Sequence, residues 1–378
     1  MKLVYGYDEV LPTQGADAEQ VMNTLAGLSR AGVDVDLLLA RAGDPAVSGE
    51  ALKRRFEVAG DFRIHHITGR VRGGRVREKL AHARNVAAHP IAAGADVIHT
   101  RNLPTVRAAL AAGLRVVYDT YRPWPRQYPI LRPWLRRLLR HPGLLGVMTH
   151  SEFAADSYLE LGLPRDTVIV AHNGYDPARM EPRLSQLDAR RALGLDERRP
   201  VVTYTGRVDP DKGIGVILEL ARRCPDIDFI VVGSHGEGPL EREGAAISNL
   251  RFVAWQPYAA TVPYLYAADM LLIPPTLVPL KRHGSTVLPL KTFLYLAAGR
   301  VIVAPDAPDT RELLRHDDNA VLVPPDDVAA CAAAIQRTAA DGERMERIAA
   351  QSLASASELT WDARGRHIVE FIERRLAA

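Results

Sequence analysis

The stretch Val201–Leu220, VVTYTGRVDPDKGIGVILEL, places a strand, a loop with two cations and a helix in direct succession. The apolar, β-branched run stops at Gly206, and helical spacing resumes at Ile214. In an open parallel sheet, ligands collect at the carboxyl ends of strands, where helix N-termini offer free N–H groups. Arg207 and Lys212 add two full positive charges there. The stretch therefore predicts an anion site, although solvated loop charges would give the same pattern.

The length of the chain, 378 residues, is too great for one ordinary core, so we expect two domains. Its composition is typical of a soluble globular protein. No basic and apolar leader opens the sequence and no apolar run approaches about 18 residues, so we expect neither a signal peptide nor a transmembrane span. Only Cys224 and Cys331 occur, without a Cys/His cluster, which indicates a cytoplasmic protein without disulfides or zinc.

Positive charge is concentrated between residues 51 and 150, where 19 Lys and Arg face 5 acids, a net +14 against +3 for the whole chain. Such a surface suits nucleic acid, an anionic membrane or phosphorylated small molecules. Stacking aromatics are nearly absent from the basic stretch Arg54–Lys79, which argues against nucleic acid.

The segment Tyr121–Leu145 combines six arginines with Trp124, Tyr128, Trp134 and several leucines. Basic residues beside tryptophan and leucine are what an interfacial helix needs to rest on anionic lipid headgroups. Three prolines interrupt the helical pattern, however. Two interpretations stay open: peripheral contact with the inner face of a membrane, or an ordinary helix that packs on its domain.

Short apolar runs alternate with helical segments through both halves of the chain, which predicts two α/β, doubly wound Rossmann-like domains facing each other across a cleft. We expect the first domain at residues 1–178, the second at 179–359, and a terminal helix at about 360–378 that packs back on the first. Pro177–Pro200, rich in Pro and Arg, is the expected connection. The predicted strands are Lys2–Tyr7, Val33–Leu39, Ile64–Ile67, Val97–His99, Val116–Tyr118, Leu145–Met148, Val168–Ala171, Val201–Thr205, Phe229–Val232, Phe252–Ala254, Met270–Ile273, Val301–Ala304 and Ala320–Val323.

A series of short motifs follows the predicted strands. They are His172–Asp176, Thr205–Arg207 with Lys212 and Gly213, Val231–Gly236, Phe252–Gln256, Ala268–Met270 and Pro289–Arg300. Each is weak alone, but in this order and spacing they resemble the family-4 glycosyltransferases of the GT-B fold over nearly the whole chain.

The resemblance implies transfer of a sugar from a nucleotide-diphosphate donor, with retention of anomeric configuration, to a glycan, lipid-linked or small-molecule acceptor. Arg207 and Lys212 match the family's diphosphate clamp and are the expected catalytic residues. Fixed cations stabilise the departing diphosphate more in the transition state than in the ground state. The scheme needs no metal and no cofactor, because the nucleotide sugar is itself a substrate.

The same resemblance assigns further residues to the two substrates. A side chain at Gly15 would collide with the donor, and backbone N–H groups near Leu290 would cradle its phosphates. Tyr121 stands where many members have a histidine, and its alternative role is that of a strand-end aromatic. The expected donor-binding residues are Gly15, Gly206, Gly233, His235, Gln256, Pro289, Leu290 and Lys291, and the acceptor-side candidates are His99, Asp119, Tyr121 and Arg122.

Three Asp-x-Asp matches, at Asp34–Asp36, Asp209–Asp211 and Asp226–Asp228, are the pattern of metal-dependent glycosyltransferases. The first and third precede strands, where turn and cap carboxylates are common. Asp209 and Asp211 flank the proposed phosphate site, where we expect them to orient Arg207 or Lys212.

One departure from the family concerns the ribose of the donor. The family has two glutamates eight positions apart, and Thr286 and Leu294 occupy those positions here. Neither side chain accepts hydrogen bonds as a carboxylate does. A catalytically weak, glycosyltransferase-like binding subunit is therefore the alternative function, and an epimerase or phosphorylase on the same fold is a third.

Overall fold

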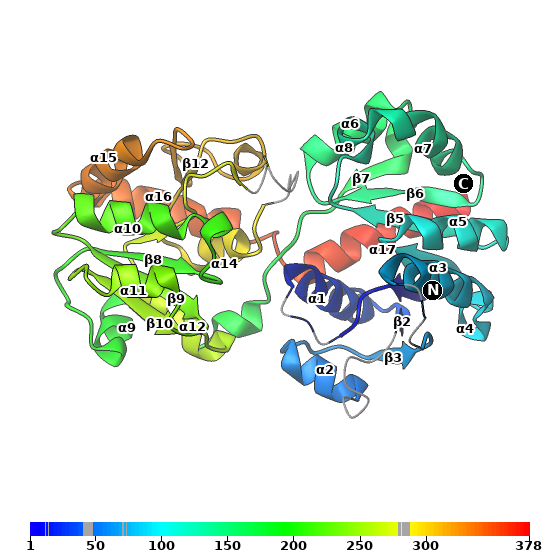
Figure 1. Ribbon diagram of the computed structural model, residues 1–378, viewed down its shortest axis with the longest axis horizontal. Coiled ribbons are helices and arrows are strands. Elements are labelled where there is room, and N and C mark those ends of the chain that lie inside the picture. The colour runs from blue at the N-terminus through cyan, green and yellow to red at the C-terminus, as the bar shows by residue number, and fades with distance from the viewer. Residues whose placement is uncertain are drawn as a thin grey trace. The chain divides into compact units, whose positions relative to one another are not determined.

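The computed structural model describes residues 1–11, 13, 15–40, 48–69, 72, 74–278, 281 and 288–378. Its contacts divide the chain into two compact units, Met1–Asn173 with Trp361–Ala378, and Gly174–Thr360. Each unit is a parallel sheet flanked by helices (Figure 1). The α/β class and the two Rossmann-like domains predicted from the sequence are confirmed.

The first unit is built on a seven-stranded parallel sheet with strand order β3-β2-β1-β4-β5-β6-β7. Its strands are β1 (Lys2–Tyr7), β2 (Asp34–Leu39), β3 (Phe62–His66), β4 (Val97–Thr100), β5 (Val116–Thr120), β6 (Leu144–Thr149) and β7 (Val168–Val170).

The helices of the first unit lie between these strands, and one more is formed by the C-terminus. They are α1 (Ala16–Arg30), α2 (Gly49–Arg55), α3 (Arg75–Ala88), α4 (Pro90–Ala93), α5 (Leu103–Ala111), α6 (Trp124–Gln127), η1 (Pro129–Leu131), α7 (Arg132–Leu139), α8 (Glu152–Glu160), η2 (Arg165–Thr167) and α17 (Trp361–Ala377).

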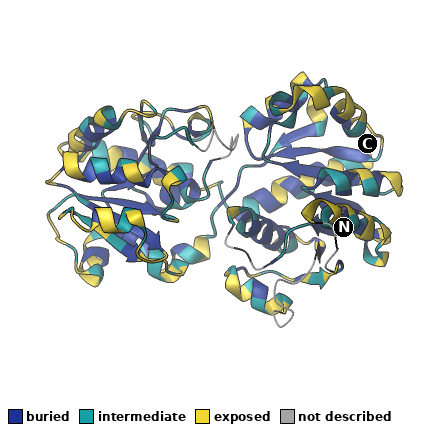
Figure 2. Cartoon of the chain, in the orientation of Figure 1, coloured by how far each residue is buried: buried dark blue, intermediate teal, exposed yellow. Residues whose placement is uncertain are grey.

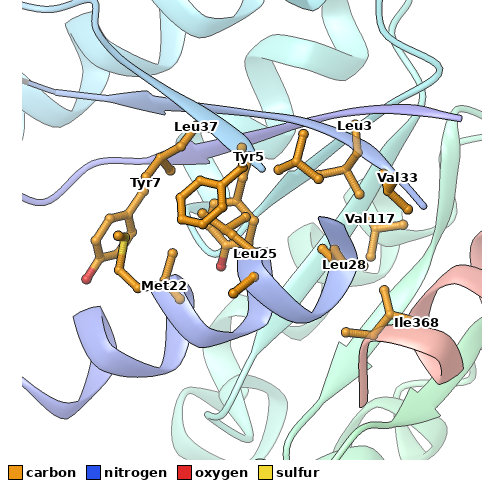
Figure 3. Packing of buried hydrophobic residues seen from close by; sticks show 14 of the residues in the cluster. Leu3, Tyr5, Tyr7, Met22, Leu25, Leu28, Val33, Leu37, Val117 and Ile368 are labelled. Carbon is orange, nitrogen blue, oxygen red and sulfur yellow. The ribbon is translucent and has the colours of Figure 1, made fainter. Parts of the chain in front are cut away.

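The core of the first unit forms because both faces of its sheet are covered, so its strands are nearly continuous apolar runs. Figure 3 shows Tyr5 of β1 over Leu25 of α1, with Ile368 of α17 on the side of Leu28, and all four belong to one buried cluster. The terminal helix thus completes the core of the first unit.

The second unit has a six-stranded parallel sheet with strand order β10-β9-β8-β11-β12-β13. Its inner strands are buried between helical layers, as in the first unit (Figure 2). The strands are β8 (Val201–Thr205), β9 (Asp228–Ser234), β10 (Leu250–Ala254), β11 (Met270–Leu272), β12 (Val301–Pro305) and β13 (Val321–Val323). The helices are η3 (Pro177–Met180), α9 (Gln186–Leu193), η4 (Pro210–Lys212), α10 (Ile214–Arg223), α11 (Pro239–Gly244), α12 (Tyr258–Ala267), α14 (Lys291–Ala298), η5 (Thr310–Glu312), α15 (Val328–Ala339) and α16 (Gly342–Ser355).

The segment Pro177–Pro200 is not the connection that the sequence predicted. It forms η3 and α9, and Ala189 and Arg190 of α9 are buried in the second unit. Arg190 bonds to the carbonyl of Ala267 and pairs with Asp269, so this segment is fixed to its own sheet. The units divide at Asn173 rather than at residue 178, with Tyr175 N–H already bonded to the Leu359 carbonyl of the second unit.

Both sheets reverse their strand order once, between β1 and β4 in the first unit and between β8 and β11 in the second. Carboxyl ends of strands at such a reversal are where open α/β sheets bind ligands. Gly206 and Arg207 directly follow β8, and Arg101 directly follows β4.

In the described part of the chain, no helix is long and apolar enough to cross a membrane.

Candidate functional site

Two glycines form the turn at the carboxyl end of β8. Gly206 has φ +138° and Gly233, at the end of β9, has φ +123°, conformations that side chains disfavour. A Cβ on Gly233 would lie 2.4 Å from the Gly206 carbonyl oxygen, and Gly206 N–H bonds to Val232 O at 2.8 Å. Both glycines, named above as donor-binding residues, thus bring β8 and β9 together at the predicted anion site.

The two expected catalytic cations lie on the loop after this turn. Arg207 and Lys212 are both exposed, and neither forms an ion pair within the described residues. Asp209 does not orient them through an ion pair: its carboxylate accepts the Asp211 N–H at 2.8 Å and caps η4. Two unneutralised positive charges therefore stand at the strand reversal of the second sheet.

The N-terminus of α14 contributes the third side of this region. Pro289 and Leu290 are partly buried, and no side chain among the described residues caps the helix. Lys291 is its first residue, and its ammonium nitrogen lies 3.6 Å from the centroid of the Tyr204 ring. It also lies 2.9 Å from where a Gly206 Cβ would be. Loop and helix thus converge on the end of β8.

His235 and Gln256 follow β9 and β10, next along the same sheet edge. The His235 ring stacks on Trp255 with centroids 6.4 Å apart and planes 17° apart, and Trp255 is 61% exposed. The Gln256 carbonyl accepts a hydrogen bond from Thr261. His235 and Trp255 thus form an exposed aromatic pair at this sheet edge.

In the first unit, the strand reversal holds a buried polar network centred on Asp119. Tyr5 Oη donates to Asp119 Oδ2 at 3.0 Å, and His150 Nε2 lies 2.6 Å from Oδ1. His99 Nε2 approaches Oδ2 to 3.7 Å, and the His99 ring packs 4.8 Å from that of Tyr5. Asp119 and His99 are fully buried, so in this structure they act on neighbouring side chains rather than on a ligand.

Two arginines supply the charge that balances Asp119. Burial would raise the pKa of Asp119, but His150, His99 and Arg101 outweigh it and hold that pKa well below the usual range. Burial lowers the pKa of His150 to about 4 and that of Arg364 to about 10. The network therefore contains an ionised carboxylate, a neutral histidine that donates from Nε2, and arginine charges.

Tyr121 and Arg122 lie at the outer edge of this network and are partly exposed. The guanidinium groups of Arg101 and Arg122 lie 5.0 and 5.4 Å from the Tyr121 ring centroid, a cation–π arrangement. Arg101 is held in place by Gln20, whose Oε1 accepts from its Nη1 at 2.8 Å. Two cations beside one aromatic ring suit an anionic group.

Gly15 has a structural explanation within the chain. It precedes α1 with an extended backbone, and a Cβ there would lie 2.2 Å from Asp17 Oδ1. Asp17 accepts a 2.8 Å hydrogen bond from the Tyr7 hydroxyl. This close approach accounts for the glycine without a ligand, so its contact with a donor stays a prediction.

The Asp-x-Asp aspartates make protein contacts. Asp36 is buried and bonds to Arg63 and His65, and the Arg63 guanidinium lowers its pKa. Asp34 and Asp228 are the first residues of β2 and β9 and pair with Arg63 and Arg199, whereas Asp226 lies in a turn, as expected. Among the described residues, no group of three His, Cys, Asp or Glu side chains is placed to hold a metal.

Two expectations about the donor ribose concern α14 and the residues before it. Leu294 packs its apolar side chain against the cluster formed by α12 and α14. Thr286 lies outside the described residues. The sequence interpretation did not identify Tyr5, Arg101, His150 or Arg364 as members of the Asp119 network; four distant segments supply these side chains, so no local pattern marks them.

Two models of protein families match the chain. The glycosyl transferases group 1 model matches residues 199–341, and the glycosyltransferase family 4 model matches residues 18–179. The matches thus fall on the second and first unit respectively.

Curated relatives point the same way. The D-inositol 3-phosphate glycosyltransferase of Nocardia farcinica is 26% identical over 53% of this chain and 46% of its own length. The phosphatidyl-myo-inositol mannosyltransferase of Mycobacterium leprae is 24% identical over 87% of this chain and 77% of its own. The chain spans about half the length of the first relatives that it matches.

A solved structure shares the fold. The Anabaena protein Alr3699/HepE in complex with UDP has a TM-score of 0.74 to this chain at 18% identity, covering 99% of this chain and all of that one. At 18% identity, this similarity establishes a shared fold only.

Proposed function

Because this chain belongs to the family-4, group 1 glycosyltransferases, we propose that it transfers a hexosyl group from a nucleotide-diphosphate sugar to an acceptor, with retention and without a metal. The donor site is the carboxyl edge of the second sheet. The observation that best supports this proposal is a pair of exposed cations, Arg207 and Lys212. They lie at the strand reversal between β8 and β11 and have no ion-pair partners in the described chain. The UDP in the Anabaena complex supports a uridine donor as the first to test.

The chemistry follows from charge. As the glycosidic bond of the donor breaks, the leaving diphosphate gains negative charge, and preorganised cations stabilise that charge without rearranging. Arg207 has a planar guanidinium that binds two phosphate oxygens, whereas Lys212 is a point charge on a flexible stem. Removing one such group costs about 3–4 kcal/mol of transition-state stabilisation.

The acceptor site is the carboxyl edge of the first sheet, around Tyr121, Arg101 and Arg122. The buried charge of Asp119 orients Arg101 electrostatically, and the Tyr121 ring offers a face for a sugar or cyclitol ring. The names of the Nocardia and Mycobacterium relatives specify inositol phosphate and phosphatidylinositol acceptors. Two arginines beside an aromatic ring suit such phosphate-bearing cyclitols, which are the first acceptors to test.

The test begins with donor binding. UDP, GDP and ADP are titrated by calorimetry, and we expect one of them to bind. Arg207→Ala and Lys212→Ala should each lower sugar transfer about 100-fold or more. Arg251→Ala is the matched control, because Arg251 is exposed on β10 near its amino end, away from the carboxyl edge. Unchanged transfer in the Arg207 and Lys212 variants would contradict the mechanism.

Retention of configuration and metal independence are tested by separate measurements. Proton NMR of the product reports whether the anomeric configuration of the donor is retained. Full activity after dialysis against a chelator supports metal independence, and activity that returns only with a divalent cation contradicts it.

A second candidate function is a binding subunit with little catalytic activity. It is favoured by Leu294, whose side chain is packed in an apolar cluster and offers no acceptor to a ribose. Nucleotide binding without transfer or hydrolysis of any tested nucleotide sugar would favour this candidate over the enzyme.

We also propose that α6, η1 and α7 rest on an anionic membrane surface. Ile130 is 89% exposed, and Tyr128, Leu131 and Trp134 are exposed beside it. Arg126 pairs with Glu160, but Arg136 and Arg137 are exposed without ion-pair partners in the described chain. Apolar and aromatic side chains next to free arginines suit the headgroup region.

Vesicle sedimentation tests this contact. We expect binding to vesicles that contain phosphatidylglycerol and little binding to pure phosphatidylcholine. Ile130→Asp with Trp134→Ser should abolish it, whereas Leu353→Ser, a similarly exposed leucine of the second unit, should not. Equal binding of both vesicle types would contradict an electrostatic contact.

A further inference from the structure

Lys291 is a lysine without a counter-ion in the described structure. Its side chain is largely withdrawn from solvent, and it forms no hydrogen bond or ion pair with any described residue. The undescribed residues 279, 280 and 282–287 cannot supply a carboxylate, because the sequence has no Asp or Glu between Asp269 and Asp306. A buried cation normally requires a partner of opposite charge.

The position of its ammonium group is defined by two contacts. Nζ lies 3.6 Å above the Tyr204 ring and 2.9 Å from where a Cβ on Gly206 would be. The Lys291 side chain therefore reaches from the N-terminus of α14 to the turn after β8. Gly206 is the residue directly before Arg207, so the ammonium group lies at the root of the cationic loop.

A second cation lies near this ammonium group. Lys212 is close enough to act on Lys291 electrostatically, and Arg207 and Asp209 act on the Tyr204 beneath it. Tyr295, on the same helix, is engaged with the Thr205 N–H at 2.8 Å. Asp209, an acid on the same loop, caps η4 and forms no ion pair with Lys291 within the described residues.

We propose that the Lys291 side chain is a third cationic ligand of the donor diphosphate, beside Arg207 and Lys212. This inference rests on the proposed function, and it goes beyond the expected backbone contacts of α14 because it assigns the ammonium group itself. A bound diphosphate would supply the counter-ion that no described residue provides to Lys291. It also meets the uncapped N–H groups of α14 at the same place.

A consequence for protonation follows. Burial, reinforced by the charge of Lys212, holds the pKa of Lys291 well below its ordinary value. A bound diphosphate introduces negative charge beside the amine and favours its protonated form. Binding should therefore raise the pKa of Lys291, and a proton is taken up at any pH between the pKa of the free protein and that of the complex. Calorimetry measures this uptake, because the apparent enthalpy then depends on the ionisation enthalpy of the buffer.

The experiment compares Lys291→Met, Lys291→Arg and the wild-type full chain by calorimetry with UDP and with inorganic pyrophosphate. Lys291→Met keeps the backbone N–H and the length of the side chain but removes the charge. We expect it to weaken binding of both ligands about tenfold, the loss of one charge-assisted hydrogen bond, and to abolish proton uptake. Lys291→Arg should retain most of the affinity but bind without proton uptake, because arginine stays charged.

Lys281→Met is the control, since Lys281 is an exposed lysine of the same unit that pairs with Asp326. Melting temperatures of all variants establish that they fold. Equal affinity and proton uptake in wild type and Lys291→Met would overturn the inference.

The two ligands separate this inference from the proposed function. Pyrophosphate binding that depends on Lys291, with no nucleotide bound, would support the inference and overturn the nucleotide-sugar donor. Nucleotide binding that is unchanged in Lys291→Met would support the nucleotide-sugar donor and overturn the role of Lys291. Failure of both ligands to bind wild type would overturn both.

Discussion

His150 Nε2 lies 2.6 Å from Asp119 Oδ1, and both residues are buried where β5 and β6 end in the first unit. The other carboxylate oxygen accepts the Tyr5 hydroxyl group. This pair joins the ends of the neighbouring strands β5 and β6 to Arg364 of the terminal helix, which also bonds to Thr24 of α1 and to the His172 carbonyl. The Asp119 network therefore also fixes the C-terminal helix α17 to the first unit.

Asp119→Asn should destabilise the first unit by about 3–5 kcal/mol, because it leaves the charges of Arg101 and Arg364 buried without their counter-ion. Chemical denaturation followed by fluorescence measures the loss. Asp362→Asn is the matched control: Asp362 pairs with Arg30 but is 42% exposed, so its loss should cost less than about 1 kcal/mol. Equal effects of the two substitutions would contradict the network as a stability element.

The free energy of unfolding should fall as the pH drops from about 6.5 to about 4. Burial lowers the pKa of His150 to about 4 and that of His82 to about 4, whereas both titrate near 6.5 when unfolded. In this window the unfolded chain binds protons that the folded chain does not. Each histidine then contributes a slope of up to about 1.4 kcal/mol per pH unit.

The depressed pKa of Asp119 acts at lower pH. Its stabilising effect is complete above the unfolded value of about 3.9 and is lost only as the pH falls through the folded value. Denaturant titrations of wild type, His150→Gln and His82→Gln at several pH values separate the contributions. Each variant should lose part of the slope between pH 6.5 and 4, and an unchanged slope in both would contradict buried neutral histidines.

The sequence predicted the strands well because both sheets are parallel and buried on both faces. Their inner strands are therefore mostly apolar and β-branched, such as Val201–Thr205, with helical spacing between them. Arg190 shows where that signal fails. It is buried by its pairing with Asp269, and an arginine in a short helix gives no apolar pattern, so Pro177–Pro200 resembled a linker.

The candidate donor site could be predicted from local sequence, whereas the Asp119 network could not. Arg207 and Lys212 lie on one loop after a recognisable strand, so their place at the sheet edge follows from local sequence. The Asp119 network depends on Tyr5, His150 and Arg364, which are brought together only by the strand order of the sheet and the return of α17. Lys291 was predicted only for its backbone, because its contact with Tyr204 depends on how α14 approaches β8.

Gly365→Ala should release the terminal helix from the first unit. A Cβ at this position would lie 2.5 Å from the Gly27 carbonyl carbon, and one on Gly27 would lie 2.3 Å from the Trp361 carbonyl oxygen. The two glycines thus let α1 and α17 cross at backbone contact, beside Ile368 in the core (Figure 3). Overpacking costs about 1–3 kcal/mol.

The control for this prediction is Gly342→Ala on α16, where a Cβ meets open space and the substitution should be neutral or stabilising. Hydrogen exchange followed by mass spectrometry should show faster exchange in α17 for Gly365→Ala alone. Full protection of α17 in that variant would mean that the crossing adjusts without cost.

Gly206→Ala should damage both stability and anion binding. The substitution forces a side chain to φ +138° and places its Cβ 2.9 Å from the Lys291 ammonium nitrogen, so the amine must move from its place over Tyr204. Backbone strain of this kind costs about 1–3 kcal/mol. Gly215→Ala, in the first turn of α10 with open space for a Cβ, should instead stabilise by up to about 1 kcal/mol. Melting temperatures and pyrophosphate titration of the two variants check both effects; normal affinity in a folded Gly206→Ala protein would show that the turn and the Lys291 ammonium group do not need this glycine to hold the anion.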